Sequence, residues 1–427
     1  MIEHNPFILI ISGVRGDTRR YRSFHLFEQA QLAGLKVQMA HITDIDLQEK
    51  TELASVVILH RAMYTPLIAR LIQQIHHNGG ILIQDIDDLL FEPEMFRFID
   101  SIDFADPLRA SLYQEEMQMY RQTLEACDAV ITSTEYLAQR IHRLGKPVNV
   151  HRNAFSLEML DLSAQAYKKR RGMDERIVIG YASGTATHNQ DFALIKPALI
   201  NIMQKFANTE LWLVGPVDPG KAWGSMGDRI HKVKKVPWRD LPAIQSQFDI
   251  NLAPVRTDNP FSQSKSEIKF VEAALVRVPT IASPSDAFKH AIRKDFNGFL
   301  ADSTKEWAST MERLIFEPGY RRQIGEIAFQ DVLQYYHPFI RAGDLVKVLN
   351  SITGSKLPMP DLDLNIDPEA VQPTQPYWSS AQLEKTPSLL QMGRYTFRQR
   401  GFQVLLKQIR VYLRRWISPV IPYRRDW

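Results

Sequence analysis

Residues 177–192 read IVIGYASGTATHNQDF, and this stretch decides the fold class. Its first six residues form an apolar run typical of a buried strand, and the small and hydroxyl-bearing residues after it predict a loop that leads into a helix. Residues 7–21, FILIISGVRGDTRRY, show the same order of strand, glycine-containing loop and helix. Two such starts, far apart along the chain, predict two α/β units.

The alternation of strands and helices continues outward from both starts. We expect strands at residues 7–12, 36–42, 55–60, 80–86, 129–133 and 148–151 in the first half, and at 177–182, 211–215, 230–236, 250–254, 280–283 and 298–301 in the second. Helix-period stretches lie between most of them. The sequence therefore predicts an α/β protein with two doubly wound domains in tandem, residues 1–160 and 161–337, and a ligand cleft at the carboxyl ends of both sheets.

The remaining segments differ from these domains in composition. Residues 161–176 are charged and weakly apolar, which favours a solvated linker, and residues 355–388 combine prolines with acids, which is typical of an extended linker. Residues 389–427 hold nine Lys and Arg and one acid, so this tail carries +8 and the rest of the chain −4 within the total of +4. Residues 402–416 predict a basic amphipathic helix, suited to an anionic membrane surface, a partner protein or the protein's own surface.

Composition excludes several classes of protein. The 427 residues are 44% hydrophobic and 23% charged, which is typical of globular domains rather than of a disordered or collagen-like chain. A single cysteine, Cys127, provides neither an internal disulfide nor a thiolate metal site. We find no signal peptide and no apolar run long enough to span a bilayer, so we expect a cytoplasmic location. No motif for specific nucleic-acid recognition accompanies the basic tail.

Two polar loops follow strands in the first half. Residues 12–22 could bring backbone and arginines to an anionic ligand, or form only a tight turn with solvated arginines. Residues 84–91, QDIDDLLF, could bind a metal, supply a base, contact sugar hydroxyls or cap a helix. The candidates are Gly13, Arg19 and Arg22 in the first loop, and Asp85, Asp87 and Asp88 in the second.

Two loops of the second half could hold phosphate. Residues 180–192 are rich in small and hydroxyl-bearing side chains, and residues 259–275 form a serine-rich loop that starts a helix, with two lysines four residues apart on one face. The alternative for the second segment is an ordinary amphipathic helix. The candidates are Gly184, Thr185 and His188 in the first segment, and Ser262, Ser264, Lys265, Ser266, Glu267, Lys269 and Glu272 in the second.

Over residues 6–351 the chain resembles the GT-B glycosyltransferases of the family 1/family 4 type. The resemblance is carried by Glu272-Ala273 followed by Pro279-x-x-Ala282-Ser283, and by the strand end 213–216, the loop 238–242 before 249–254, and Asn297-Gly298. It implies two Rossmann-like domains facing across a cleft, with acceptor mainly on the first and donor nucleotide on the second. It also implies a last helix, at residues 338–354, that packs back on the first domain.

The resemblance also assigns roles to residues. Glu272 matches the second glutamate of the family's E-x7-E motif, which binds the donor ribose; Ser264 stands at the first, where Glu267 is the candidate substitute. Val236 and Pro237 would border the base. Lys265, Lys269, His188 and Asp87 are the candidate catalytic residues, while Gly13, Arg19, Arg22, Asp85 and Asp88 are assigned to the acceptor side.

The implied activity is transfer of a sugar, typically a hexose, from a nucleoside-diphosphate sugar to a polysaccharide, lipid-linked or protein glycan acceptor. Such enzymes usually retain the anomeric configuration and need no bound metal or other cofactor. A catalytically degenerate GT-B binding module and a sugar-nucleotide epimerase of the same fold are the alternatives. The tail would then place the enzyme at the inner face of a membrane or on a protein partner through residues 402–416.

Overall fold

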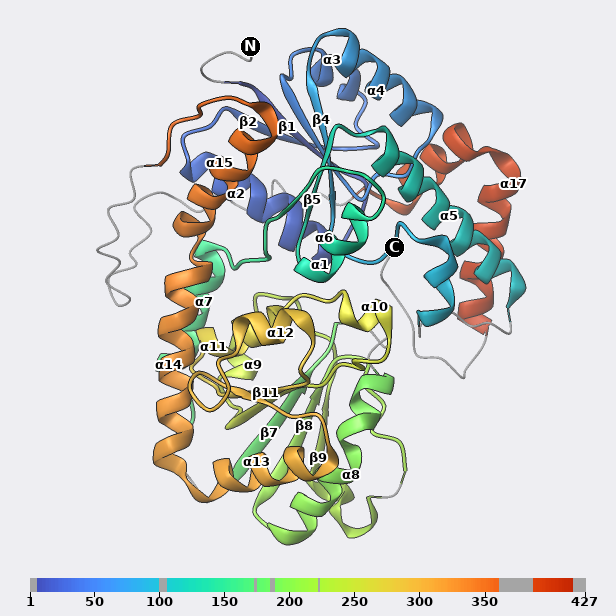
Figure 1. Ribbon diagram of the computed structural model, residues 1–427. Coiled ribbons are helices and arrows are strands. Elements are labelled where there is room, and N and C mark those ends of the chain that lie inside the picture. Colours follow the sequence, from blue (N-terminus) through green and yellow to red (C-terminus); the bar gives the residue numbers. More distant parts are fainter. Residues whose placement is uncertain are drawn as a thin grey trace. The chain divides into compact units, whose positions relative to one another are not determined.

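The computed structural model describes residues 6–99, 106–172, 175–184, 189–221, 223–360 and 387–417, with side chains up to Leu413 in the last segment. The chain divides into two compact units. The second unit is Phe155–His337, and the first unit is formed by the residues before and after it. Each unit contains a six-stranded parallel sheet with helices around it (Figure 1). The predicted α/β class with two Rossmann-like units is therefore confirmed.

The sheet of the first unit has the strand order β2-β1-β3-β4-β5-β6. Its strands are β1 (Ile8–Ser12), β2 (Val37–His41), β3 (Val56–His60), β4 (Ile81–Ile86), β5 (Ala129–Thr132) and β6 (Val148–Val150). Its helical segments are α1 (Asp17–Arg19), the π-helix η1 (Arg20–Phe24), α2 (His25–Leu32), α3 (Leu47–Glu52), α4 (Pro66–His77), the 3-10 helix η2 (Pro93–Phe98), α5 (Pro107–Ala126), α6 (Glu135–His142), α15 (Pro338–Thr353) and α17 (Leu389–Ile417).

Burial explains why these segments form strands and helices. Every residue of β1 and β3 is buried, as expected for central strands of a parallel sheet covered on both faces. The helix α4 begins where Thr65 accepts a hydrogen bond from the Ile68 amide and Pro66 takes the first helical position. The helix α15 returns to this unit and packs against α2, where Leu345 and Val346 join the core under the sheet (Figure 1).

The sheet of the second unit has the strand order β12-β11-β10-β7-β8-β9. Its strands are β7 (Ile177–Ala182), β8 (Thr209–Val214), β9 (Ile230–Val233), β10 (Ile250–Ala253), β11 (Thr280–Ala282) and β12 (Phe299–Leu300). Its helices are α7 (Leu157–Lys168), α8 (Asn189–Lys205), the 3-10 helix η4 (Gly224–Arg229), α9 (Leu241–Gln245), α10 (Pro260–Gln263), α11 (Ile268–Leu275), α12 (Asp286–Ala291), α13 (Thr304–Phe316) and α14 (Pro318–Tyr336).

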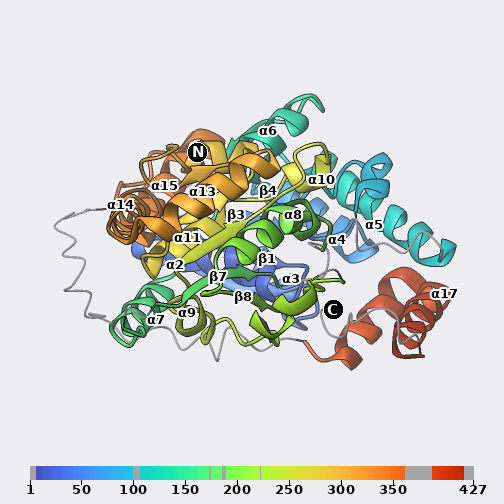
Figure 2. The ribbon, with the colours of Figure 1, turned by 90° about the horizontal axis from the view of Figure 1, so that it is seen from below.

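The segment expected as a solvated linker at 161–176 is different in the structure. Its first half belongs to α7, which begins at Leu157 after Ser156 caps its first turn and which packs beside α9 (Figure 2). Met159, Leu160 and Ala166 are buried. Because α7 has few buried apolar residues and charged side chains lie among them, its sequence shows no clear helical spacing of apolar residues. The unit also begins at Phe155, a few residues before the domain boundary expected at 160.

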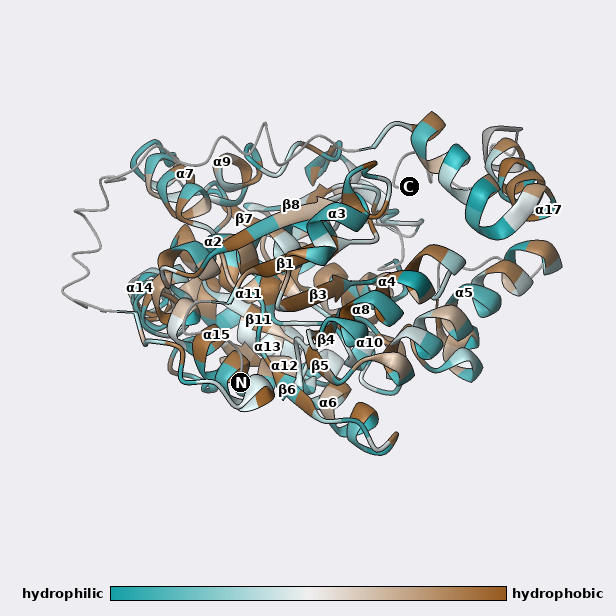
Figure 3. Ribbon diagram, turned by 90° about the horizontal axis from the view of Figure 1, so that it is seen from above, coloured by the Kyte–Doolittle hydropathy of each residue, from teal (hydrophilic) through white to brown (hydrophobic). Residues whose placement is uncertain are grey.

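The C-terminal helix α17 docks on the first unit, beside α5 (Figure 1). Tyr395 is buried and its hydroxyl lies 3.1 Å from the Thr65 hydroxyl, and Arg400 forms a 2.7 Å ion pair with Glu116. Gly401, at φ +84°, breaks the helix into two parts. Apolar and hydrophilic residues alternate along its turns (Figure 3), and among the described helices none is long and apolar enough to cross a membrane. Residues 361–386 of the predicted linker and 418–427 of the tail lie outside the described residues.

Candidate functional site

In the second unit, Lys269 lies at the carboxyl edge of the sheet. It belongs to the first turn of α11, and its Nζ donates to the Tyr181 hydroxyl at 3.3 Å while lying 4.4 Å from the centre of the Tyr181 ring. Tyr181 is fully buried near the end of β7 and stacks on Phe192 of α8. The ammonium group is therefore held in place by one strand and two helices.

The pKa of Lys269 is lowered to about 8, mainly by burial; the charges of Asp191 and Glu272 oppose the shift, and that of Lys265 adds to it. Burial also raises the pKa of Tyr181 well above its usual value, so this hydroxyl stays neutral. A partly desolvated cation at the carboxyl edge of a parallel sheet is suited to bind an anionic group there.

The other residues expected in this segment have different positions. Lys265 lies 4.2 Å over the Phe261 ring. The Ser264 hydroxyl is buried and donates to the Phe261 carbonyl at 2.7 Å, and the Ser262 amide donates to Asn259, which caps α10. Glu272, on α11, is almost fully buried. Ser266, just before α11, is partly buried.

Glu267 points into the unit. It is almost completely buried, and its Oε1 accepts a 2.8 Å hydrogen bond from the Tyr336 hydroxyl at the end of α14. Glu267 thus joins α11 to α14 in this structure. Its expected role as the substitute for the first glutamate of the family motif is not visible in these contacts.

The loops after β7, β8 and β9 complete this edge. Gly184 is exposed directly after β7, whereas Thr185 and His188 lie outside the described residues. Gly215 has φ +95°, and a Cβ added there would lie 1.9 Å from the Ser183 carbonyl oxygen, so the loops after β7 and β8 meet at a glycine. Val236 is partly buried and Pro237 is exposed in the loop after β9.

Asp191 is a residue of this edge to which sequence reasoning gave no role. It is buried in the first turn of α8, and its Oδ1 accepts a 2.9 Å hydrogen bond from the Arg256 amide in the loop after β10. Its charge favours the protonated form of Lys269. Its position just after the small-residue loop at 180–190 was the available signal.

In the first unit, Arg22 and Asp85 bind one another in the core. The Arg22 Nε lies 3.0 Å from both carboxylate oxygens, and its Nη1 donates to the His151 carbonyl at 2.6 Å and to Asn153 at 3.0 Å. Both side chains are essentially inaccessible to solvent. Arg22 lies in the π-helix η1 and Asp85 in β4, so this ion pair anchors the helix to the sheet rather than facing a ligand directly.

Asp87 and Asp88 gather around Arg61, a residue that sequence reasoning missed. The Arg61 Nε donates to Asp87 at 2.5 Å, and the Arg61 Nη2 forms an ion pair with Asp88. The His60 Nε2 lies 3.7 Å from the Asp87 Oδ1. The Arg61 guanidinium and His60 hold the pKa of Asp87 far below its usual range although burial opposes them. The backbone of Arg61 has φ +45°, which residues other than glycine seldom adopt. Such backbone strain is often found at functional sites.

Gly13 permits this arrangement, because a Cβ there would lie 2.3 Å from the Arg61 carbonyl oxygen. Arg19 is buried, lies 5.0 Å over the Phe24 ring and has its pKa lowered by burial. Within the described part of the chain, no group of three His, Cys, Asp or Glu side chains is placed to hold a metal ion. The carboxyl edge of the first sheet thus offers Arg61, Asp87 and Asp88 as a compact polar group.

The comparisons with known proteins agree with this architecture. Residues 176–316 match the family model described as Glycosyl transferases group 1. The chain is similar to the solved structure of a sucrose-phosphate synthase from Thermosynechococcus elongatus, with a TM-score of 0.56, 16% identity, and coverage of 82% of this chain and 100% of that one.

Two further solved structures show the same likeness. For Anabaena HepE in complex with UDP-glucose the TM-score is 0.55 at 14% identity, over 81% of this chain and 100% of that one. For a glycosyltransferase from Rickettsia africae it is 0.56 at 11% identity, over 83% and 100%. No curated protein matches the sequence significantly. The chain therefore has the GT-B fold, and its residues 176–316 match the model of the glycosyl transferases group 1 family.

Proposed function

We propose that the protein is a glycosyltransferase that moves a sugar, a hexose by preference, from a nucleoside-diphosphate sugar to an acceptor hydroxyl with retention of anomeric configuration. The observation that carries the proposal is the partly desolvated Lys269 ammonium at the carboxyl edge of the family-matched domain. HepE, which has the same fold, is described in complex with UDP-glucose.

The chemistry follows from charge. Breaking the anomeric C–O bond leaves a nucleoside diphosphate and an oxocarbenium-like sugar, so the main task of the protein is to stabilise the leaving diphosphate. Lys269 and Lys265 supply positive charge for this, and Tyr181 and Asp191 keep the Lys269 side chain oriented and protonated. In this proposal Glu272 holds the ribose hydroxyls, and the loop at Val236 and Pro237 borders the base. No protein-bound metal or other cofactor is required.

The acceptor is assigned to the first unit. Asp87 and Asp88, held by Arg61, present carboxylates at the edge where β3 and β4 end. Ionised carboxylates in such a position accept hydrogen bonds from sugar hydroxyls and can orient the attacking hydroxyl. The proposed acceptor is a polysaccharide, lipid-linked or protein glycan.

Donor binding and hydrolysis test the proposal. UDP, GDP and ADP sugars are screened by thermal shift, and release of nucleoside diphosphate from the stabilising sugar is then followed. Lys269→Ala should abolish release, whereas Lys289→Ala, at an exposed position of α12 in the same unit, should leave it unchanged. Binding without any turnover would instead favour the degenerate binding module, and formation of an epimerised sugar would favour the epimerase. If no nucleotide sugar binds, the proposal that the protein is a glycosyltransferase is contradicted.

We also propose that α17 holds the enzyme on an anionic membrane at its inner face. Although the helix docks on the first unit, Phe397, Phe402, Ile409 and Leu413 remain exposed beside exposed arginines such as Arg410. Exposed apolar and basic side chains on one helix are the pattern of interfacial helices.

Liposome flotation tests the membrane proposal. The protein should float with vesicles that contain phosphatidylglycerol and not with pure phosphatidylcholine vesicles. The triple change Arg394→Glu, Arg398→Glu and Arg410→Glu reverses exposed charges without touching Tyr395 or Arg400, and should abolish flotation. Flotation of this variant at the wild-type level would contradict the proposal and leave a protein partner as the alternative.

A further inference from the structure

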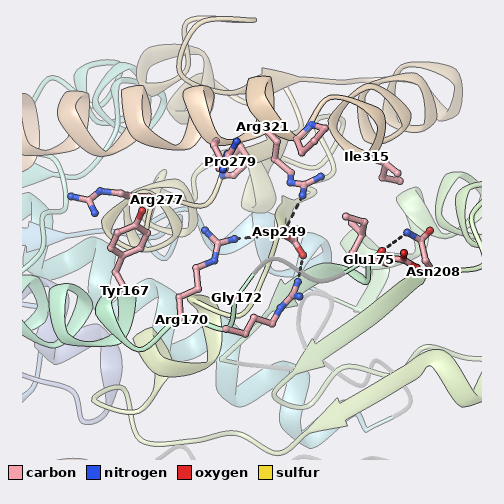
Figure 4. Close-up of a pocket in the computed structure, with 14 residues that line it drawn as sticks. Tyr167, Arg170, Gly172, Glu175, Asn208, Asp249, Arg277, Pro279, Ile315 and Arg321 are labelled. Carbon is pink, nitrogen blue, oxygen red and sulfur yellow. Dashed lines mark hydrogen bonds and ion pairs between the residues drawn. The ribbon is translucent and has the colours of Figure 1, made fainter.

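A cavity lies at the amino edge of the sheet in the second unit, the edge opposite to Lys269. Its volume is about 660 Å³, within the range of small-molecule pockets. Ile177 at the start of β7, Asn208 before β8, Asp249 before β10 and Pro279 before β11 line its floor. Figure 4 shows Arg170 and Arg321, which come from different segments, pointing toward Asp249.

The cavity is strongly basic. Five arginines line it, against two carboxylates, Asp249 and Glu175; the arginines are Arg170, Arg171, Arg277, Arg321 and Arg322. Two of these arginines follow α7, one follows α11 and two belong to the start of α14. Segments separated by more than a hundred positions thus bring cations to one place.

At the centre, three guanidinium groups face the single carboxylate of Asp249. Arg171 forms an ion pair with it, and the nitrogens of Arg170 and Arg321 lie 3.5 Å from its Oδ1. Asp249 also accepts a 2.9 Å hydrogen bond from the Val178 amide. Three cations around one anion give this group a net charge of +2. Each guanidinium also donates to a backbone carbonyl, Arg170 to Phe248, Arg171 to Gln247 and Arg321 to Leu314, and these neutral carbonyls leave the net charge unchanged.

These three guanidinium groups are largely shielded from solvent. The side chains of Arg170, Arg171 and Arg321 are 23%, 16% and 9% exposed. Burial lowers the pKa of Arg170 and of Arg321, although the charge of Asp249 opposes the shift. Excess positive charge in a partly desolvated place raises the energy of the protein, and an anion bound there would lower it.

Arg277, which lines one side of the cavity, has a strained backbone conformation. Arg277 has φ +55°, its guanidinium lies 4.1 and 4.4 Å from the centres of the Tyr167 and Phe329 rings, and its Nε forms a 2.9 Å ion pair with Glu326. Gly325 of α14 makes room, because a Cβ there would lie 2.2 Å from the Arg277 carbonyl oxygen. Strained backbone conformations of this kind persist where the surrounding structure enforces them, and they cluster at ligand-binding sites.

We propose that this cavity binds a phosphorylated small molecule of about the size of a sugar phosphate. Guanidinium groups bind phosphate oxygens through paired hydrogen bonds, and several guanidiniums around one place suit a dianionic phosphate better than a single carboxylate. The volume leaves room for a sugar beside the phosphate. The site is distinct from the proposed donor site at the opposite edge, so its presence does not depend on transferase activity.

Isothermal titration with glucose 6-phosphate, inorganic phosphate and glucose tests the proposal on the full chain. The two phosphates should bind and glucose should not; tighter binding of glucose 6-phosphate than of inorganic phosphate shows that the sugar part is recognised. Arg322→Glu should weaken binding at least tenfold. Arg322 is exposed, so this change spares the buried group around Asp249 and should not unfold the protein. Lys305→Glu, an equal change of charge at an exposed position of α13 outside the cavity lining, is the matched control.

Lys269→Ala distinguishes the two edges of the sheet. Phosphate binding that survives Lys269→Ala and is lost in Arg322→Glu supports the proposal, whether or not the protein hydrolyses a nucleotide sugar. Loss in Lys269→Ala with retention in Arg322→Glu would place the phosphate at the donor edge and overturn it. Equal weakening by Arg322→Glu and Lys305→Glu, or no binding by the wild type up to about 10 mM, would overturn it as well.

Discussion

The depressed pKa of Lys269 makes donor binding depend on pH in a predictable direction. A lysine carries its charge below its pKa, so the attraction for a diphosphate is present at neutral pH and is lost as the pH rises through about 8. If only the protonated form binds, the apparent dissociation constant rises from about 1.1 times its limiting value at pH 7 to about 11 times at pH 9, a weakening of about tenfold. The terminal phosphate of the nucleoside diphosphate has a second pKa of about 6, so it is already mostly ionised at pH 7 and adds only a small slope of opposite sign.

The assay is isothermal titration of the nucleoside diphosphate identified by the thermal-shift screen, at half-unit steps from pH 7 to 9. Lys269→Arg is the control, because a guanidinium remains charged throughout and its curve should be flat. The reasoning is refuted if the wild-type dissociation constant stays constant over this range, or if Lys269→Arg shows the same tenfold change.

Three further predictions concern stability and reactivity. Gly215→Ala should lower the free energy of unfolding by about 2–5 kcal/mol in thermal denaturation, because the new Cβ meets the Ser183 carbonyl at a positive φ; an unchanged midpoint would contradict the described loop. Arg22→Met should cost about 3–5 kcal/mol in urea unfolding by leaving Asp85 buried without its partner, and clearly less in the Asp85→Asn background. Burial raises the pKa of the Cys127 thiol, so a thiol reagent should modify it only after denaturant is added; rapid modification of the native protein would contradict this.

The sequence was most informative where burial dictates residue type. Strands such as β1 and β7 are covered on both faces, so their apolar runs identify them without knowledge of the rest of the chain. The helix α7 was missed because few apolar residues mark its buried face, and the charged residues just after it supply Arg170 and Arg171 to the cavity at the amino edge. Local composition did not reveal whether this charged segment faces water or a pocket.

The site was predictable as a set of loops but not as a set of contacts. Lys269 was identified from its place in a motif, whereas its contact with Tyr181 depends on β7 and β10 being neighbours in the sheet. Arg61 belongs to no motif, and its importance appears only when the ends of β3 and β4 lie together. Asp85 looked equivalent to Asp87 in sequence, yet it lies in the core on Arg22.

The return of α15 to the first unit has a consequence for the order in which the protein can mature on the ribosome. The first unit is interrupted by the second, and Ala342, Leu345 and Leu349, which join the core of the first unit, are synthesised only after the whole second unit. At translation rates of about 5–20 residues per second, roughly 180 intervening residues delay them by about 10–40 s. During that interval the apolar side of α2 has no covering helix, whereas the inserted unit has its whole sequence as soon as His337 is made. The nascent first unit thus exposes apolar surface until α15 is made, and this is the stage at which we expect a chaperone to bind the chain.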